Sequence, residues 1–481
     1  MTDAFELLDL AAKRLGGMAV AANDEFFGPK ERLLEPAAAV SVPGRYTDRG
    51  KWVDGWETRR RREAGHDWCV VRLGVPGVVR GVVVDTTHFK GNHPQACSLD
   101  GLAGDWVELL PRTELAPDAE QRLPVDAPVL VTHVRLNIHP DGGVARLRVH
   151  GEPLPDLRAL AGPAGGAFDL AAAANGGEAV DCSDMFFSSR HNLVMPGDAA
   201  DMGEGWETRR RRGPGHDWVV VRLAAEAVVE RVEVATTHFK GNHPESCTVE
   251  ACLAPDGGRH QAPQTGWWTM VARSRLGPHA THAFPVAAEG PATHVRLAIH
   301  PDGGVSRLRV FGRVGDDGWR RWGVDWLNAL AAPQAEAELL ACCGSTAWAA
   351  GMAQRRPFAD ADAMATNADQ VWAALGQEDW LEAFAAHPPI GERAAAGWSA
   401  GEQAGVAAAD QATLAELAEG NRVYEERFGR TFLICATGQS VAAMLAALRQ
   451  RLGNDPATEL RVAAEEQRKI TRLRLEKLLR P

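Results

Sequence analysis

The stretch Thr86–Pro94, TTHFKGNHP, occurs a second time without change at Thr236–Pro244. An identity of nine residues that contains two His, one Lys and one Asn does not arise from biased composition. Shorter identities accompany both copies in the same order: GWETRRRR at Gly55–Arg62 and Gly205–Arg212, GHDW at Gly65–Trp68 and Gly215–Trp218, and HVRLNIHPDGG and HVRLAIHPDGG from His133 and His294. The chain therefore contains two copies of one module.

The composition is that of a globular protein larger than one ordinary domain. A length of 481 residues favours about two to four domains. The 45% hydrophobic and 24% charged content is typical of soluble proteins, and the net charge of −11 argues against nucleic acid as the main partner. No apolar run is long enough to span a bilayer, and the acidic first residues do not resemble a secretory leader. The eight Cys show no disulfide or metal spacing, which predicts reduced, buried thiols in a cytoplasm.

Both modules have the pattern of β-sandwiches. Apolar residues alternate or form short β-branched runs that Gly, Pro and Asp interrupt. In the first module the predicted strands are Cys69–Leu73, Val78–Asp85, Val134–Ile138 and Leu147–Val149. We expect a short helix and lead-in over residues 1–22 and a linker over residues 152–168. The two modules should share one all-β fold, a sandwich or a barrel, and pack as a pseudo-symmetric pair.

The last third of the chain has a different pattern. After a Gly-rich linker at residues 312–318, Ala, Leu and Glu predominate and apolar residues recur at spacings of three and four. The predicted helices are Leu327–Ala331, Ala335–Cys342, Ala368–Ala374, Thr413–Glu426, Ser440–Leu452 and Asp455–Leu479. We therefore predict three domains: β-sandwich repeats at residues 1–153 and 154–314, and an all-α domain at residues 315–481.

Each β module carries the same polar and aromatic side chains in its loops. The first set is Trp56, Glu57, Arg59, His66, Asp67, His88, Lys90, Asn92 and His93; the second is Trp206, Glu207, Arg209, His216, Asp217, His238, Lys240, Asn242 and His243. Loops at a sandwich end can converge, Arg binds carboxylates, Asn and Lys donate hydrogen bonds, and His moves protons. Such a set suits a small, polar, anionic substrate. The alternatives are copied structural networks, or a metal site, although no tight ligand spacing is present.

These repeated segments resemble the signature segments of the allantoicases. The resemblance implies two tandem jelly-roll or galactose-binding-like β-sandwich modules, and hydrolysis of allantoate to (S)-ureidoglycolate and urea. Allantoate carries a carboxylate and two ureido groups on one carbon, so Arg can hold the carboxylate while Asn and Lys orient ureido oxygens. From this chemistry we expect His88 and His93, or their copies His238 and His243, to protonate the leaving urea nitrogen.

The α domain contains AHPPIGE at Ala386–Glu392 and WSAGEQAG at Trp398–Gly405. Proline disfavours helical geometry in the preceding residue, so His387 should lie at a helix end or loop mouth. Ser399 and Glu402 also have the spacing of a helix capping box, which is the structural alternative for these two residues.

With the closing KITRLRL at Lys469–Leu475, these motifs resemble OHCU (2-oxo-4-hydroxy-4-carboxy-5-ureidoimidazoline) decarboxylases. The resemblance implies cofactor-free decarboxylation to (S)-allantoin, with His387 and Glu402 as the catalytic pair. The remaining residues of the predicted substrate site are Pro388, Ser399, Gln403, Ile434 and Arg474.

The sequence thus predicts a bifunctional cytoplasmic enzyme of purine breakdown that acts on small ureides, without nucleic-acid or membrane partners. The resemblance further implies a homo-oligomer. No cofactor is expected, and a divalent metal for the β modules stays open. The rival interpretations are a carbohydrate- or ligand-binding protein, and a protein with one retained activity in which the β pair is a scaffold. The sequence leaves open which repeat holds the allantoicase site, or whether the site lies between them.

Overall fold

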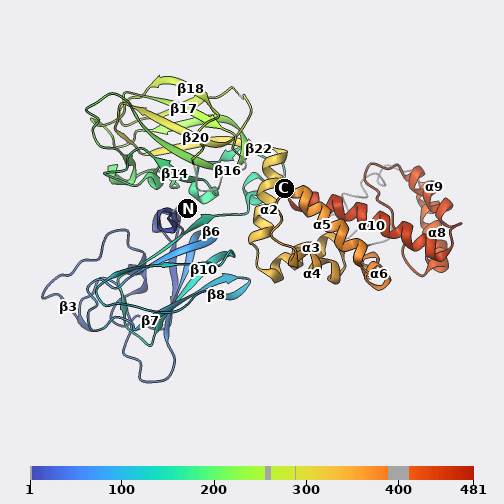
Figure 1. Cartoon of the computed structure of the whole chain (residues 1–481), viewed down its shortest axis with the longest axis horizontal. Coiled ribbons are helices and arrows are strands. Elements are labelled where there is room, and N and C mark those ends of the chain that lie inside the picture. The colour runs from blue at the N-terminus through green and yellow to red at the C-terminus, as the bar shows by residue number, and fades with distance from the viewer. Residues whose placement is uncertain (1–2, 255–261, 288, 388–410) are drawn as a thin grey trace. The chain divides into compact units, whose positions relative to one another are not determined.

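The computed structural model describes residues 3–254, 262–287, 289–387 and 411–481 (Figure 1). The chain divides into two compact units. The first comprises Met1–Trp319 with Ala329–Ala331 and Pro481, and it holds both β repeats. The second comprises Arg320–Asn328 and Ala332–Arg480, and it is helical.

The first repeat is built around one long strand, β6 (Asp67–Asp85). The first half of β6 pairs with β2 (Met18–Ala22) and β10 (Leu130–His139), and its second half pairs with β9 (Glu120–Pro124) and β12 (Arg146–Pro153). The sheet continues through β7 (Ala96–Ala103) and β8 (Asp105–Glu114) on one side and β1 (Leu8–Asp9) on the other. Because β6 changes partners along its length, it joins the two layers of a sandwich.

The second repeat has the same topology (Figure 1). Its long strand is β16 (Asp217–Ala235), and its partners are β14 (Glu178–Cys182), β19 (Thr281–Pro285), β20 (Pro291–His300) and β22 (Arg307–Val314). The outer strands are β13 (Phe168–Asp169), β17 (Ser246–Cys252) and β18 (Trp267–Arg275). Side chains alternate between buried and less buried positions along residues 67–76 of β6, as the period of two predicts, and the alternation in β16 is interrupted at Val220. The predicted fold class is confirmed.

Short elements complete each repeat. In the first repeat they are η1 (Ala4–Glu6), η2 (Lys13–Leu15), η3 (Lys30–Leu34), β3 (Tyr46–Thr47), β4 (Gly50–Lys51), β5 (Trp56–Glu57) and β11 (Gly143–Val144). In the second they are η4 (Ala173–Asn175), η5 (Arg190–Val194), η6 (Met202–Glu204), β15 (Trp206–Glu207) and β21 (Gly304–Val305), with α1 (Leu157–Ala161) between the repeats.

Four local expectations were wrong. Residues 3–22 form only the short 3₁₀ helices η1 and η2 and no α-helix, because β1 pairs with β12 and β2 with β6, and this pairing outweighs helical spacing. The expected linkers are partly ordered: α1 lies within residues 152–168, and α2 begins at Asp316. The two strands expected between residues 69 and 85 are one strand. All eight Cys are free thiols, but Cys182 and Cys435 are only partly buried.

The helical unit has helices at most of the predicted places, but the predicted Leu327–Ala331 spans the end of one helix and the break before the next, and the last two helices are one residue shorter at each end than predicted. Its elements are α2 (Asp316–Ala329), α3 (Ala332–Cys343), α4 (Thr346–Gln354), α5 (Ala361–Ala374), α6 (Gln377–Ala385), α8 (Gln411–Phe428), α9 (Val441–Arg451) and α10 (Pro456–Leu478). As expected, Asp455 caps α10 and Pro456 is its first residue. Helix α10 packs against α3, α5 and α6. None of the helices in the described part of the chain has the length and apolar composition that a membrane crossing requires.

Candidate functional site

Three stretches of each repeat carry the repeated residues, and we call them the signature segments: residues 56–67, 86–95 and 139–143, with their copies 206–217, 236–245 and 300–304. Backbone hydrogen bonds join the three stretches in the first repeat. The Gly143 N–H donates to the Asn92 carbonyl at 2.8 Å, and the Thr58 N–H donates to Gly142 at 3.1 Å. The stretches therefore converge as the sequence predicted for loops at a sandwich end.

A carboxylate and an amide face each other within these segments. The Asn92 Nδ2 donates to Glu57 Oε1 at 2.6 Å, and Asn242 donates to Glu207 at the same distance. Burial raises the pKa of Glu57, while the bond from Asn92 and the charge of Lys51 oppose the shift. Glu57 is thus a buried carboxyl that can hold a proton at a higher pH than an exposed one.

Two imidazoles of the signature segments lie side by side. The ring centroids of His66 and His139 are 4.8 Å apart, as are those of His216 and His300. Burial and then the charges of His66 and Arg112 lower the pKa of His139. A neutral imidazole near pH 7 can accept a proton, so this pair is suited to acid–base chemistry.

Arg61 fixes the start of β6. Its guanidinium donates to Asp67 at 2.7 Å, and its backbone N–H donates to Asp141 Oδ2 at 2.8 Å. Asp67 is buried, and Arg211 pairs with Asp217 in the same way in the second repeat. Asp67 and Asp217, which were predicted to bind substrate, therefore each form an ion pair with an arginine of the same repeat.

His88 and His238 have an unusual backbone. Their φ angles are 73° and 71°, a left-handed region that residues with a Cβ rarely adopt. The Nε2 atoms of the two rings face the carbonyls of Ala39 and Ala199 at 3.2 and 2.9 Å. The described contacts thus connect these rings to the loops that contain Ala39 and Ala199, and not to the Glu57 and Glu207 carboxylates. Backbone strain of this kind is concentrated at functional sites.

The remaining predicted residues of the β repeats fall into three groups. The Trp56 and Trp206 side chains are fully buried, and each indole donates to a backbone carbonyl at 2.8 Å. Arg59 and Arg209 are exposed and pair with Asp24 and Asp184. Lys90, Lys240, His93 and His243 lie in the 86–95 and 236–245 segments, where Lys90 is exposed and lies 3.4 Å from Asp118.

In the helical unit the structure brings two of the predicted residues together. His387 follows α6, and its Nδ1 lies 3.5 Å from the Arg474 guanidinium of α10. Arg474 is 6% exposed. Behind it, burial raises the pKa of Cys343 to about 11, so the thiol stays protonated. His387 thus lies at a helix end, as the Pro that follows it predicted.

The other decarboxylase residues are divided between two places. Ile434 lies in an apolar cluster with Tyr424, Phe432 and Leu448, apart from the described contacts of His387. Pro388, Ser399, Glu402 and Gln403 lie outside the described residues. Their predicted roles therefore stay predictions.

Family comparisons agree with this architecture. A family model described as allantoicase repeat matches residues 8–154 and again residues 168–315. The chain belongs to the allantoicase family. The OHCU decarboxylase family model matches residues 328–476. The two matches indicate a hydrolase and a lyase of purine breakdown in one chain, as the sequence predicted.

The allantoicase part has similar proteins in bacteria and in yeast. A probable allantoicase of Pseudomonas aeruginosa (strain UCBPP-PA14) is 51% identical over 318 residues, which are 63% of this chain and 95% of that protein. Probable allantoicase 2 of Burkholderia pseudomallei (strain K96243) is 49% identical over 320 residues, 64% and 95% of the two chains. The crystal structure of Saccharomyces cerevisiae allantoicase is 35% identical, covers 64% of this chain and 93% of that chain, and has a TM-score of 0.54.

Sequence reasoning missed several residues of the allantoicase signature segments. His139 and His300 lie beside predicted histidines, and Arg61 and Arg211 bind predicted aspartates. Their signal was present, because both arginines belong to GWETRRRR and both histidines to the repeated HPDGG. The sequence could not predict which of the four adjacent arginines in this motif binds the buried aspartate.

Proposed function

We propose that the signature segments of the β repeats hydrolyse allantoate to (S)-ureidoglycolate and urea, and that the helical unit decarboxylates OHCU to (S)-allantoin. One observation carries the hydrolase assignment. The carboxylate–amide pair and the imidazole pair recur in both repeats at the same distances, 2.6 and 4.8 Å. These groups lie in the stretches where the two repeats are most alike.

The residues have complementary roles in this proposal. Arg59 or its copy Arg209 holds the substrate carboxylate, and Lys90 and Asn92 or their copies orient ureido oxygens. His88 and His93, or His238 and His243, protonate the urea nitrogen as it leaves. Glu57, a buried carboxyl with a raised pKa, and the neutral His139 are the added candidates for the group that takes a proton from water.

Urea release from allantoate tests the hydrolase, with and without EDTA. We expect urea in both conditions, and loss of at least a factor of ~100 when His88→Ala and His238→Ala are combined. Full turnover of that double variant would refute the histidine roles. No urea from the unmodified protein would refute the hydrolase and leave the β pair as a scaffold.

The EDTA arm addresses the metal alternative. Across residues 3–254, 262–287, 289–387 and 411–481, no group of three or more His, Cys, Asp or Glu is arranged to hold a metal ion. Loss of urea release with EDTA, and its return with a divalent cation, would contradict the cofactor-free proposal.

For the decarboxylase, we propose that His387 acts on the hydroxyl of the substrate as carbon dioxide leaves. Arg474 binds an anionic group of the substrate, and Glu402 orients His387 or shares its proton. Pro388, Ser399, Gln403 and Ile434 complete the wall of the site. The close approach of Arg474 to His387 supports this arrangement.

The test is OHCU decarboxylation by His387→Ala, with circular dichroism to verify folding. We expect the rate to fall to that of the uncatalysed reaction while urea release from allantoate is unchanged. Undiminished decarboxylation would refute the role of His387.

We also propose that the protein is a cytoplasmic homo-oligomer that acts on small ureides. Sedimentation of the purified chain tests the oligomer. A single species at the monomer mass of 51.7 kDa would contradict it.

A further inference from the structure

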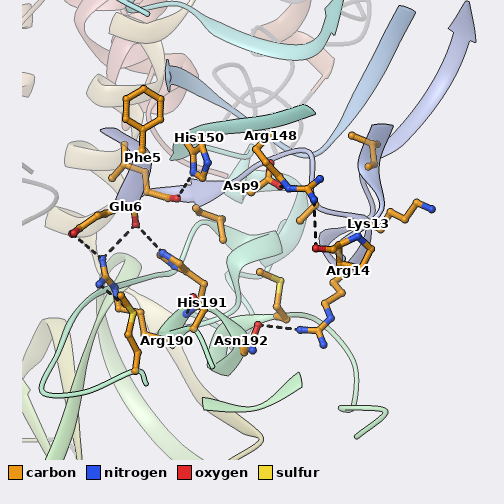
Figure 2. A pocket seen from close by; sticks show the side chains of 18 residues that line it. Phe5, Glu6, Asp9, Lys13, Arg14, Arg148, His150, Arg190, His191 and Asn192 are labelled. Atoms are coloured by element: carbon orange, nitrogen blue, oxygen red, sulfur yellow. Dashed lines mark hydrogen bonds and ion pairs between the residues drawn. The ribbon is translucent and has the colours of Figure 1, made fainter. Parts of the chain in front are cut away.

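A pocket of about 450 Å³ lies between the two β repeats, away from the signature segments (Figure 2). The first repeat supplies η1, β1, η2 and β12, and the second supplies η5 and the loop before it. Phe5, Leu7, Leu34 and Met195 contribute apolar walls. The volume fits a small molecule rather than a chain segment.

Cationic side chains outnumber carboxylates among the residues that line the pocket, although Lys13 pairs with Glu35 at 2.5 Å and Arg14 with Glu204 at 2.8 Å. Four cationic side chains, Lys13, Arg14, Arg148 and Arg190, line it together with two carboxylates, Glu6 and Asp9. Figure 2 shows the guanidiniums of Arg14, Arg148 and Arg190 around one space.

The two inner guanidiniums are held mainly by neutral groups. Arg148 donates to the carbonyls of Leu147 and Pro36, and its nearest carboxylate oxygen, on Asp9, is 4.0 Å away. Arg190 donates to Ala179 and lies 3.6 Å from Glu6. Burial lowers the pKa of Arg148 and raises that of Asp9, so both charged forms are incompletely compensated. An anion bound here would gain from both guanidiniums.

His191 adds a hydrogen-bond acceptor to the lining of the pocket. Its Nε2 lies 2.9 Å from the Glu6 carbonyl, which can only accept, so Nε2 carries the hydrogen. Burial and then the charge of Arg190 lower the pKa of His191 to about 4, so the ring is neutral at pH 7. Its buried Nδ1 is then a bare acceptor that has no partner among the described residues. A buried acceptor of this kind favours a ligand that brings an N–H group.

Several residues that line the pocket differ from those at the matching positions of the other repeat. Lys13 and Arg14 of η2 correspond to Ala173 and Ala174 of η4. His150 pairs with Asp9, whereas Phe311 pairs with Asp169. Arg190 and His191 begin η5, whereas Lys30 and Glu31 begin η3. These lining residues are thus positions where the repeats have diverged, whereas Asp9 and Arg148 keep their equivalents Asp169 and Arg309.

We propose that this pocket binds a small ureido carboxylate, with the carboxylate on Arg148 and Arg190 and a ureido N–H on His191. The bound molecule contacts both repeats and holds them together. No residue of the signature segments lines the pocket, so the proposal places this binding site apart from the site of hydrolysis.

The experiment titrates the whole protein with N-carbamoylglycine, the simplest ureido carboxylate, by calorimetry. Two variants form a matched pair. Arg148→Met removes a guanidinium of the pocket, and Arg309→Met removes its counterpart in the second repeat. Arg309 also binds backbone carbonyls and a strand Asp, but it does not line the pocket.

We expect one site per chain that is lost, or weakened at least ~10-fold, in Arg148→Met and is unchanged within ~2-fold in Arg309→Met. In His191→Phe the preference for N-carbamoylglycine over acetate, which has no N–H, should disappear. Urea release from allantoate should be unchanged in Arg148→Met.

Three results would overturn the proposal: no binding to the unmodified protein, equal losses in the two Arg variants, or loss of both binding and urea release in a folded Arg148→Met. The third would mean that the pocket is the catalytic site. Failure of the hydrolase assignment would look different, because the unmodified protein would then release no urea while the titration still showed the site.

Discussion

The signature segments and the pocket between the repeats have opposite relations to the duplication. In the signature segments the two repeats keep the same residues and the same contacts, such as the carboxylate–amide pair at 2.6 Å in each. In the pocket the corresponding residues differ in charge, as with His191 and Glu31. A duplicated pair therefore has two kinds of position: those that each repeat needs for itself, and those that exist once because they lie between the copies.

The largest expected effect comes from breaking the repeated pair. Glu57→Gln combined with Glu207→Gln should lower urea release ~100-fold or more, because the amide cannot take a proton from water. Each single variant then tells whether both repeats work. A loss of about half in each indicates two independent sites, whereas near-complete loss in one identifies the working repeat. Unchanged turnover in the double variant would show that the pair is structural.

Stability provides the control for this substitution. Gln keeps the acceptor for Asn92, so the loops should stay folded. The folded pKa of Glu57 is raised above its ordinary 4.5, so its contribution to stability is largest below that pH and is lost as the pH rises through the raised pKa. Glu57→Gln should therefore flatten the decline of unfolding free energy above pH 4.5, as measured in guanidinium. A steeper decline of the unfolding free energy in the variant would contradict the predicted direction of this pH dependence.

The next effect is a local disruption of one signature segment. A Cβ on Gly143 would lie 2.0 Å from the Phe89 ring, which is 1% exposed beneath the 86–95 segment. Gly143→Ala should cost ~1–3 kcal/mol of unfolding free energy by overpacking and should impair urea release. Gly91→Ala is the matched control in the same segment, because its Cβ would meet nothing within 4 Å. Equal losses in both variants would argue against the Phe89 contact as the cause.

Local sequence patterns were enough to predict most of the fold and the residues of the signature segments. The period of two along β6 and β16 indicated strands, and spacings of three and four indicated the helices. The repeated polar residues were visible because identity between two copies is itself a signal. One of the errors was at residues 1–22, where pairing with β6 and β12 decides the structure.

The pocket could not be predicted from the sequence. Its residues come from several separate short elements and loops of the two repeats, and they follow no period. The duplication even conceals them, since attention to matching positions passes over those that differ. Lys13, Arg14 and His191 gain their relevance only from the packing of one repeat on the other.

A smaller effect tests the protonation state of the pocket. Because the folded pKa of His191 is lowered from 6.5 to about 4, its contribution to stability is present above pH 6.5 and is lost as the pH falls through 4. His191→Phe should reduce the acid sensitivity of the β repeats by up to about 1.4 kcal/mol per pH unit in this range. Guanidinium unfolding at pH 7 and pH 4.5 measures it. An unchanged slope would mean that another group, such as His294, accounts for the acid sensitivity.

The smallest expected effect concerns Asp118, which contacts a signature segment and has a different residue, His279, as its counterpart in the second repeat. Asp118 Oδ1 accepts the His88 backbone N–H at 2.8 Å, and His279 Nδ1 accepts that of His238 at the same distance. Different side chains thus support the same left-handed turn. Asp118→His should leave the melting temperature and urea release unchanged, since the acceptor is replaced and the ion pair with Lys90 is exposed.

Asp118→Ala completes this test, because it removes the acceptor altogether. Its bond to the His88 N–H is also the main reason that the pKa of Asp118 is lowered, so the carboxylate is charged and accepting at neutral pH. If His88 serves in hydrolysis, Asp118→Ala should reduce urea release while Asp118→His does not. If both variants lose activity equally, the carboxylate itself takes part, and the first repeat differs in function from the second, where a His replaces it.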